Sequence, residues 1–186
     1  MPLTASLKQI DGSVLDALYE SITQAHSTLR PAVSITPLEY SPGLSTITGC
    51  QVLLKCEHLQ HTGSFKFRGA SNKIRLLDEG GRQSGVIAAS SGNHGQALAL
   101  AGQRAGVPVT VYTSTSASAY KVQAMRVLGA QVISLPTDPL SVELEAARQA
   151  QAQGKVFVSP YNDLQVSAGQ GTIAIELFEQ APDLDR

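Results

Sequence analysis

The stretch VIAASSGNHGQALALAGQRAGVPVTVYT, residues 86–113, decides the fold. It begins with a short apolar run, continues through a polar turn into an alanine-rich segment of helical length, and ends in a β-branched run after Pro108. Two such runs joined by a helix of about 10–15 residues are typical of a βαβ unit, whose strands are parallel. Gly106 stands where a helix that ends at Ala105 commonly has a left-handed residue. This stretch therefore predicts an α/β protein with a parallel sheet.

The same alternation extends outward on both sides. We expect strands at 51–57, 86–90, 109–113, 131–135 and 156–158, and helices at 66–77, 93–105, 119–128, 140–153 and within 168–180. Gly80 and Gly81 are expected to stop the helix at 66–77, and an amphipathic helix is expected over 13–22. The short connections indicate one compact α/β body over about residues 52–155.

Composition narrows the class of protein. The 186 residues, of which 42% are hydrophobic, suffice for one domain or slightly more with a packed core. A net charge of −1 leaves no strongly basic surface on average, so we expect no nucleic-acid partner. No apolar window is long enough to span a membrane, and residues 1–12 contain no apolar core of the signal-peptide type. We therefore expect a soluble, cytoplasmic protein without a membrane partner.

The cysteines and histidines show no spacing typical of a metal site or a disulfide framework. Cys50 and Cys56 are too few for a disulfide framework, and their spacing fits no zinc motif. The histidines show no HExxH spacing, and GxSxG is absent. We expect no metal site.

Lys66 has an unusual setting in TGSFKFRGA, residues 62–70. Its apolar neighbours and the positive end of a helix both disfavour the ammonium form, so we expect the pKa of Lys66 to be lowered. The neutral amine is the form that attacks a carbonyl in Schiff-base chemistry. Taken alone, the local composition is also that of a surface lysine whose stem lies on apolar neighbours.

The motif SSGNHGQ, residues 90–96, follows a predicted strand at the edge of the sheet where ligand sites of parallel sheets gather. Its hydroxyls, its amide and the N–H groups of a helix start could hold a carboxylate or phosphate. Serine or asparagine before a helix also forms an N-cap without any ligand, and His94 alone could be structural.

The motif GQGTIA, residues 169–174, matches the loose dinucleotide fingerprint GxGxxA. The segment before it shows no strand pattern, and the sequence ends before the acidic residue that the fingerprint requires. We do not expect nucleotide binding here.

Several motifs together resemble the fold-type II pyridoxal-phosphate enzymes, and among them the threonine/serine dehydratase and serine racemase group. They are TPL at 36–38, LKCE at 54–57, TGSFKFRGA at 62–70, SSGNHGQ at 90–96, the run 121–130, and GQGT at 169–172. Their order and spacing match from about residue 30 to the last residue. Phe67 stands where cysteine synthases and threonine synthases have aspartate. In this respect the sequence after Lys66 resembles the dehydratases and racemases instead.

The resemblance implies a parallel sheet with flanking helices, arranged as a complete small domain and part of a large one. Residues 1–51 would be the N-terminal part of the large domain, 52–155 the small α/β domain, and 156–186 the start of the remaining large domain. Family members are longer, so the resemblance also implies an N-terminal fragment without the glycine-rich loop that holds the cofactor phosphate.

The resemblance also implies roles for individual residues. Lys66 would bond covalently to pyridoxal 5′-phosphate, Asn93 would hydrogen-bond its ring hydroxyl, and Phe65 would pack against its ring. The loop that holds the substrate carboxylate would comprise Ser90, Ser91, Gly92, Asn93 and His94. Ser91 is a second catalytic candidate, because a serine here resembles the opposite-face base of the racemases.

The implied activity is that of a dehydratase that converts L-threonine or L-serine to the 2-oxo acid and ammonia. Serine racemase remains an alternative because of Ser91, and so does another hydroxy amino acid dehydratase, such as a 3-hydroxyaspartate dehydratase. A catalytically inactive truncated fragment is the alternative of a different class. The expected partner is a small amino acid substrate, and the full-length protein is expected to be a homo-oligomer.

Overall fold

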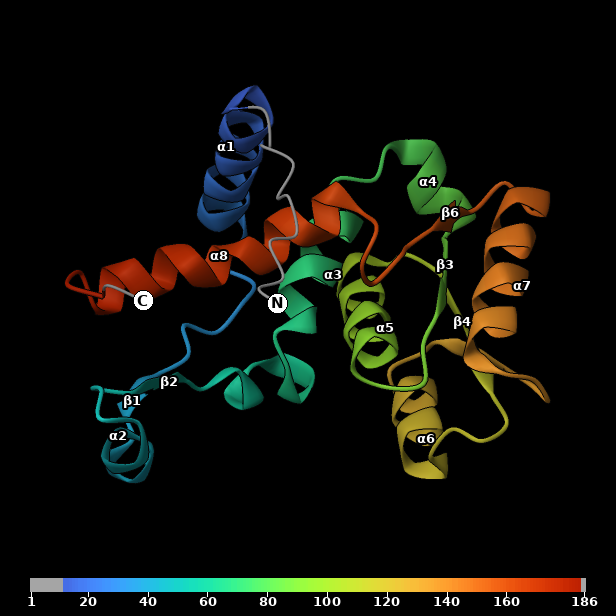
Figure 1. Cartoon of the computed structure of the whole chain (residues 1–186). Helices are drawn as coiled ribbons and strands as arrows, with labels where there is room; N and C mark the ends of the chain where they lie inside the picture. Colours follow the sequence, from blue (N-terminus) through green and yellow to red (C-terminus); the bar gives the residue numbers. More distant parts are fainter. Residues whose placement is uncertain (1–11, 185–186) are drawn as a thin grey trace, which may run out of the picture.

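The computed structural model describes residues 12–184 (Figure 1). The expectation about a signal-type core falls on residues 1–12, almost all of which lie outside that range. The helices are α1 (Gly12–Leu29), α2 (Pro42–Thr48), α3 (Lys66–Arg75), α4 (Glu79–Ser84), α5 (Asn93–Ala105), α6 (Ala119–Val127), α7 (Pro139–Ala152) and α8 (Leu164–Gln180). The strands are β1 (Leu38–Tyr40), β2 (Leu53–Lys55), β3 (Val86–Ala89), β4 (Val109–Ser114), β5 (Gln131–Leu135) and β6 (Val156–Phe157).

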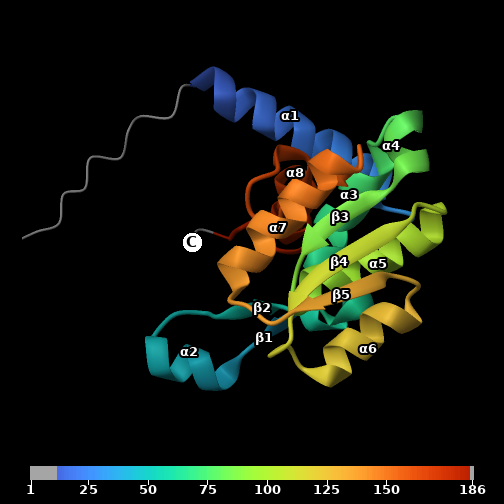
Figure 2. The ribbon, with the colours of Figure 1, turned by 90° about the vertical axis from the view of Figure 1, so that its right-hand side faces the viewer.

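A four-stranded parallel sheet in the order β5-β4-β3-β6 forms the centre of the α/β body (Figure 2). Val86 of β3 pairs with Val109 of β4 on one side and with Val156 of β6 on the other. Side chains of one face, such as Val111, enter a core with α3, α5 and α6. Ile87, on the other face, packs against α7. The predicted parallel sheet with flanking helices is confirmed.

The N-terminal half departs from the sequence-based expectations. The strand expected at 51–57 is only β2, and it pairs antiparallel with β1 outside the main sheet. Helix α2 was not predicted, although Ser41 caps it by accepting a hydrogen bond from the Leu44 N–H, and Pro42 occupies its first turn. The predicted helix stop at 80–81 was wrong, because both glycines lie inside α4, which the Asp78 side chain caps.

Helices α3 and α8 cross where two glycines face each other. A Cβ on Gly69 would lie 2.7 Å from the Val166 carbonyl oxygen, and one on Gly169 would lie 2.6 Å from the Arg68 carbonyl oxygen. Gly171, two residues further along α8, approaches the Ile22 side chain of α1, from which a Cβ would lie 2.7 Å away. The motif GQGTIA therefore lies within a helix, where its glycines permit close helix packing.

A buried ionic network ties α3 to the chain on both sides. The Arg68 side chain is 0% exposed and donates to both carboxylate oxygens of Glu57, at 2.9 and 2.8 Å. It also donates to both oxygens of Glu176 on α8, at 2.6 and 2.9 Å. Lys55 completes the network with a 2.7 Å contact to Glu176. Two buried cations thus face two carboxylates, the pairing that buried charges require.

The described helices include none that is both long and apolar enough to cross a membrane. The division at residues 51 and 155 stays a prediction. Strand β6 lies just beyond the second boundary and hydrogen-bonds to β3.

Candidate active site

Lys66 begins α3, directly after a sharp turn. Thr62 and Gly63 both adopt left-handed backbone angles, with φ of 60° and 70°, and this turn directs the chain into the helix. The Lys66 Nζ donates to the Pro160 carbonyl oxygen at 3.2 Å. It lies 5.1 Å from the centre of the Phe65 ring and 5.8 Å from that of Tyr161. Partial burial lowers the pKa of Lys66, in the direction that the sequence suggested.

The loop of residues 90–94 joins β3 to α5. The Ser90 hydroxyl accepts hydrogen bonds from the N–H groups of Gly92 and Gly95, at 3.2 and 2.9 Å, so it holds the loop in shape. Ser91 and Asn93 are exposed, and within the part of the chain that the structure describes neither side chain forms a hydrogen bond or an ion pair. The two side chains are therefore available to a ligand.

His94 behaves differently from its neighbours. Its side chain is buried, 4% exposed, and its Nε2 lies 3.3 Å from the Val158 carbonyl oxygen. Burial, together with the charge of Lys66, lowers the pKa of His94 to about 4, although the Val158 hydrogen bond opposes the shift. His94 is therefore neutral at pH 7. Its ring faces the end of β6, so only its backbone N–H could serve the carboxylate role implied by the resemblance.

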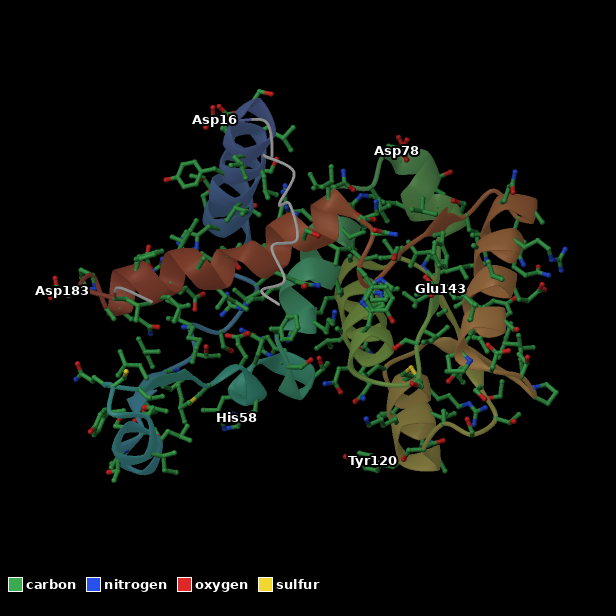
Figure 3. The ribbon with its side chains drawn as sticks, viewed as in Figure 1. Asp16, His58, Asp78, Tyr120, Glu143 and Asp183 are labelled. Atoms are coloured by element: carbon green, nitrogen blue, oxygen red, sulfur yellow. The ribbon has the colours of Figure 1, made fainter. Side chains whose placement is uncertain are left out.

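A cavity of about 470 Å³ opens at the ends of β3 and β4. Ser90 and Ser91 line it together with Lys121 and Tyr161. Glu143 of α7, labelled in Figure 3, also lines it. The carboxyl edge of a parallel sheet is where α/β proteins bind ligands.

The structure brings together Lys66, Phe65 and Tyr161, and it places Tyr161 with Ser90 and Ser91 around one cavity. Sequence reasoning missed Tyr161, which is 74% exposed and lies 95 positions after Lys66. Its position just after β6, at the carboxyl edge of the sheet, was the available signal.

Known proteins resemble the chain over most of its length. The family described as pyridoxal-phosphate dependent enzyme matches residues 29–186. The chain is similar to an L-threonine ammonia-lyase of Thermotoga maritima, with 48% identity over 89% of this chain and 41% of the relative. It is similar to an L-threo-3-hydroxyaspartate ammonia-lyase of a Pseudomonas species, with 41% identity over 90% of this chain and 52% of the relative.

Among solved structures, maize serine racemase superposes with a TM-score of 0.84 at 36% identity, over 89% of this chain and 50% of the racemase. The chain thus spans about half the length of the proteins that it matches.

Proposed function

The chain belongs to the family of pyridoxal-phosphate-dependent enzymes, and on that premise we propose that it acts as an ammonia-lyase that converts L-threonine or L-serine to the 2-oxo acid and ammonia. One observation carries the proposal. The partly buried Lys66 amine, with its lowered pKa, lies beside Tyr161, which lines the same cavity as Ser90 and Ser91. The 48% identity to an enzyme named L-threonine ammonia-lyase supports the substrate class.

The residues present fit the cofactor. The Lys66 amine near two aromatic rings can supply a covalent anchor, and the exposed Asn93 amide, which has no partner among residues 12–184, can supply a hydrogen-bonding group. When bound, pyridoxal phosphate supplies an aldehyde for the lysine amine and a ring that withdraws electrons from the substrate α-carbon. We propose that Lys66 holds the aldehyde carbon, that Phe65 packs on the ring, and that Asn93 hydrogen-bonds the ring hydroxyl.

Lys66 has two tasks in this proposal. Its lowered pKa increases the fraction of neutral amine at pH 7, and the neutral amine is the nucleophile toward an aldehyde. When Lys66 is not bonded to the cofactor, its Nζ would take the proton from the substrate α-carbon. The Pro160 carbonyl oxygen, 3.2 Å from Nζ, then accepts a hydrogen bond from the resulting ammonium.

The loop of residues 90–94 would hold the substrate carboxylate. The N–H groups of Asn93 and His94 lie in the first turn of α5 and have no acceptor within the helix. The Ser91 hydroxyl forms no hydrogen bond with any residue of the described range 12–184, so it could add a further donor. Ser90 and Gly92 act on the loop itself, because the Ser90 hydroxyl accepts from the Gly92 N–H. A helix start with a hydroxyl beside it is a suitable carboxylate site.

Serine racemisation is the second candidate, favoured by the free and exposed Ser91 hydroxyl. Ser91 would exchange a proton with the α-carbon on the face opposite Lys66. Replacement of Ser91 by alanine should then reduce D-serine formation from L-serine much more than keto-acid release. If D-serine formation is unchanged in Ser91→Ala, the racemase candidate loses its basis. Activity on threo-3-hydroxyaspartate, which the 41% identical relative suggests, is tested in the same keto-acid assay.

The decisive experiment targets the amine. Incubate the chain with pyridoxal phosphate, reduce it with borohydride, and locate the adduct by absorbance and peptide mass. We expect an adduct on the peptide containing Lys66, its absence in Lys66→Ala, and no change in the control Lys155→Ala. An adduct of equal yield in Lys66→Ala would contradict the assignment. A chain that forms no adduct would instead support the catalytically inactive alternative.

The remaining expectations belong to the same proposal. They are the domain division at 51 and 155, a homo-oligomer, and location in the cytoplasm. Sedimentation of the purified protein and cell fractionation test the last two.

A further inference from the structure

A second cavity, of about 210 Å³, lies between α1, α3, α4 and α5. It shares no lining residue with the cavity of the candidate active site. Its walls include the buried apolar side chains of Leu29, Phe67 and Ile74. The cavity can therefore take an apolar group out of water.

Three arginines line this apolar cavity: Arg75 of α3, Arg82 of α4 and Arg104 of α5. None of them forms an ion pair within residues 12–184, in contrast to Arg68. The Arg82 side chain donates to the backbone carbonyl oxygens of residues 75 and 77. The Arg104 side chain donates to the backbone carbonyl oxygen of residue 32, and its guanidinium carbon lies 5.0 Å from the Phe67 ring centre. Neutral acceptors leave the three positive charges uncompensated, so the cavity favours an anion.

Two residues that line this cavity each carry a buried donor atom without an acceptor among residues 12–184. Within that described range, the Nε of Arg75 and the Oγ of Ser71 are both buried without a hydrogen-bond partner, although Arg75 donates through another nitrogen to Asn72. The two residues are four positions apart on α3 and so lie on the same face of the helix. Both line the cavity. Buried polar groups are seldom left unsatisfied in proteins, so a missing acceptor is the simplest explanation.

We propose that this cavity binds a small aliphatic monocarboxylate. The carboxylate would accept hydrogen bonds from Arg75 and Ser71, and the alkyl chain would lie against Leu29, Phe67 and Ile74. Arginine suits this role because its planar fork matches the two oxygens of a carboxylate. The volume of 210 Å³ corresponds to about seven water molecules at roughly 30 Å³ each, which suits an acid of about seven heavy atoms.

Pentanoate is the probe, titrated into the full chain by calorimetry, with acetate and 1-pentanol as the two comparison ligands. We expect saturable binding of pentanoate, and binding of acetate and pentanol that is at least tenfold weaker. Arg75→Gln should weaken pentanoate binding about tenfold, as expected for loss of one charge-assisted hydrogen-bonding group. Ala105→Leu, at an exposed position on the cavity wall, should block the cavity with the charges intact. Arg126→Gln on α6, outside the cavity, is the matched control and should bind normally.

Several outcomes would overturn the inference. Equal binding of pentanol would mean that the arginines contribute nothing. Loss of binding in Ser91→Ala, with normal binding in Arg75→Gln, would place pentanoate at the loop of residues 90–94. Dissociation of a dimer by pentanoate in sedimentation, without binding to the monomer, would identify the cavity as an interface between copies. If circular dichroism shows that Arg75→Gln does not fold, Arg75→Lys takes its place in the binding test. This variant keeps the positive charge but lacks Nε, so it should bind pentanoate several-fold more weakly than the unchanged chain.

Discussion

Replacement of Gly169 by alanine tests the close contact between α3 and α8. The added Cβ would lie 2.6 Å from the Arg68 carbonyl oxygen, 2.7 Å from the Asn72 Cβ and 2.8 Å from the Gly69 Cα. Ordinary contact begins at 3.4 Å, so α3 and α8 must separate by about 0.8 Å. The obstructing atoms belong to the backbone or its first side-chain carbon, and no rotamer change can move them aside.

The expected loss follows from two opposing effects. Overpacking at a site without room costs about 1–3 kcal/mol, and the backbone contacts here favour the upper end. The higher helix propensity of alanine stabilises the folded state by at most about 1 kcal/mol relative to glycine. We therefore expect Gly169→Ala to lower the free energy of unfolding by about 2 kcal/mol.

Urea unfolding, followed by circular dichroism at pH 7, measures the change. Gly43→Ala is the matched control, because Gly43 also lies in a helix, and a Cβ there meets no atom within 4 Å. The control should be stabilised by up to about 1 kcal/mol. If Gly169→Ala were as stable as Gly43→Ala, the close crossing of α3 and α8 would be refuted.

Three further predictions address buried charge and backbone strain. His94 binds a proton more weakly in the folded state, where its pKa is about 4, than in the unfolded state, where it is 6.5, so the free energy of unfolding falls as pH drops from 6.5 toward 4. The expected loss between pH 7 and pH 5 is about 2 kcal/mol. His94→Gln should remove this part of the pH dependence, as measured by urea unfolding at both pH values. Arg68→Met leaves Glu57 and Glu176 buried without their main partner and should cost about 3–5 kcal/mol, measured by thermal unfolding; a small loss would mean that water enters the network. Thr62→Asn should raise the melting temperature, because asparagine tolerates the left-handed φ of 60° better than the β-branched threonine does. An unchanged midpoint of thermal unfolding would show that this turn is unstrained.

Local sequence signals predicted the α/β half of the fold well. Strand β3 and helix α5 begin at the predicted residues, and Gly106 ends α5 in the left-handed conformation as expected. These elements follow from short-range causes, namely apolar runs, helical periodicity and a glycine cap. The pairing of β1 with β2 was not predictable in this way, because both strands are only three residues long and depend on each other.

The same distinction between local and long-range causes applies to the residues of the candidate site. Lys66 and the loop of residues 90–94 were identified because their motifs are contiguous in sequence. Tyr161 was missed because only the tertiary fold brings its ring near the Lys66 amine. The direction of the His94 ring was likewise unpredictable, since it depends on the Val158 carbonyl oxygen 64 positions away.

The ionic network around Arg68 has a consequence for the order of events during synthesis of the chain. Glu57 leaves the ribosome before Arg68, but Glu176 follows Arg68 by 108 residues. At about 5–20 residues per second, Arg68 waits roughly 5–20 s for its second carboxylate. During that interval Arg68 and Lys55 have only the Glu57 carboxylate between them, so burial of both side chains would leave one positive charge unpaired. We therefore expect α3 to take its final place only after α8 has emerged.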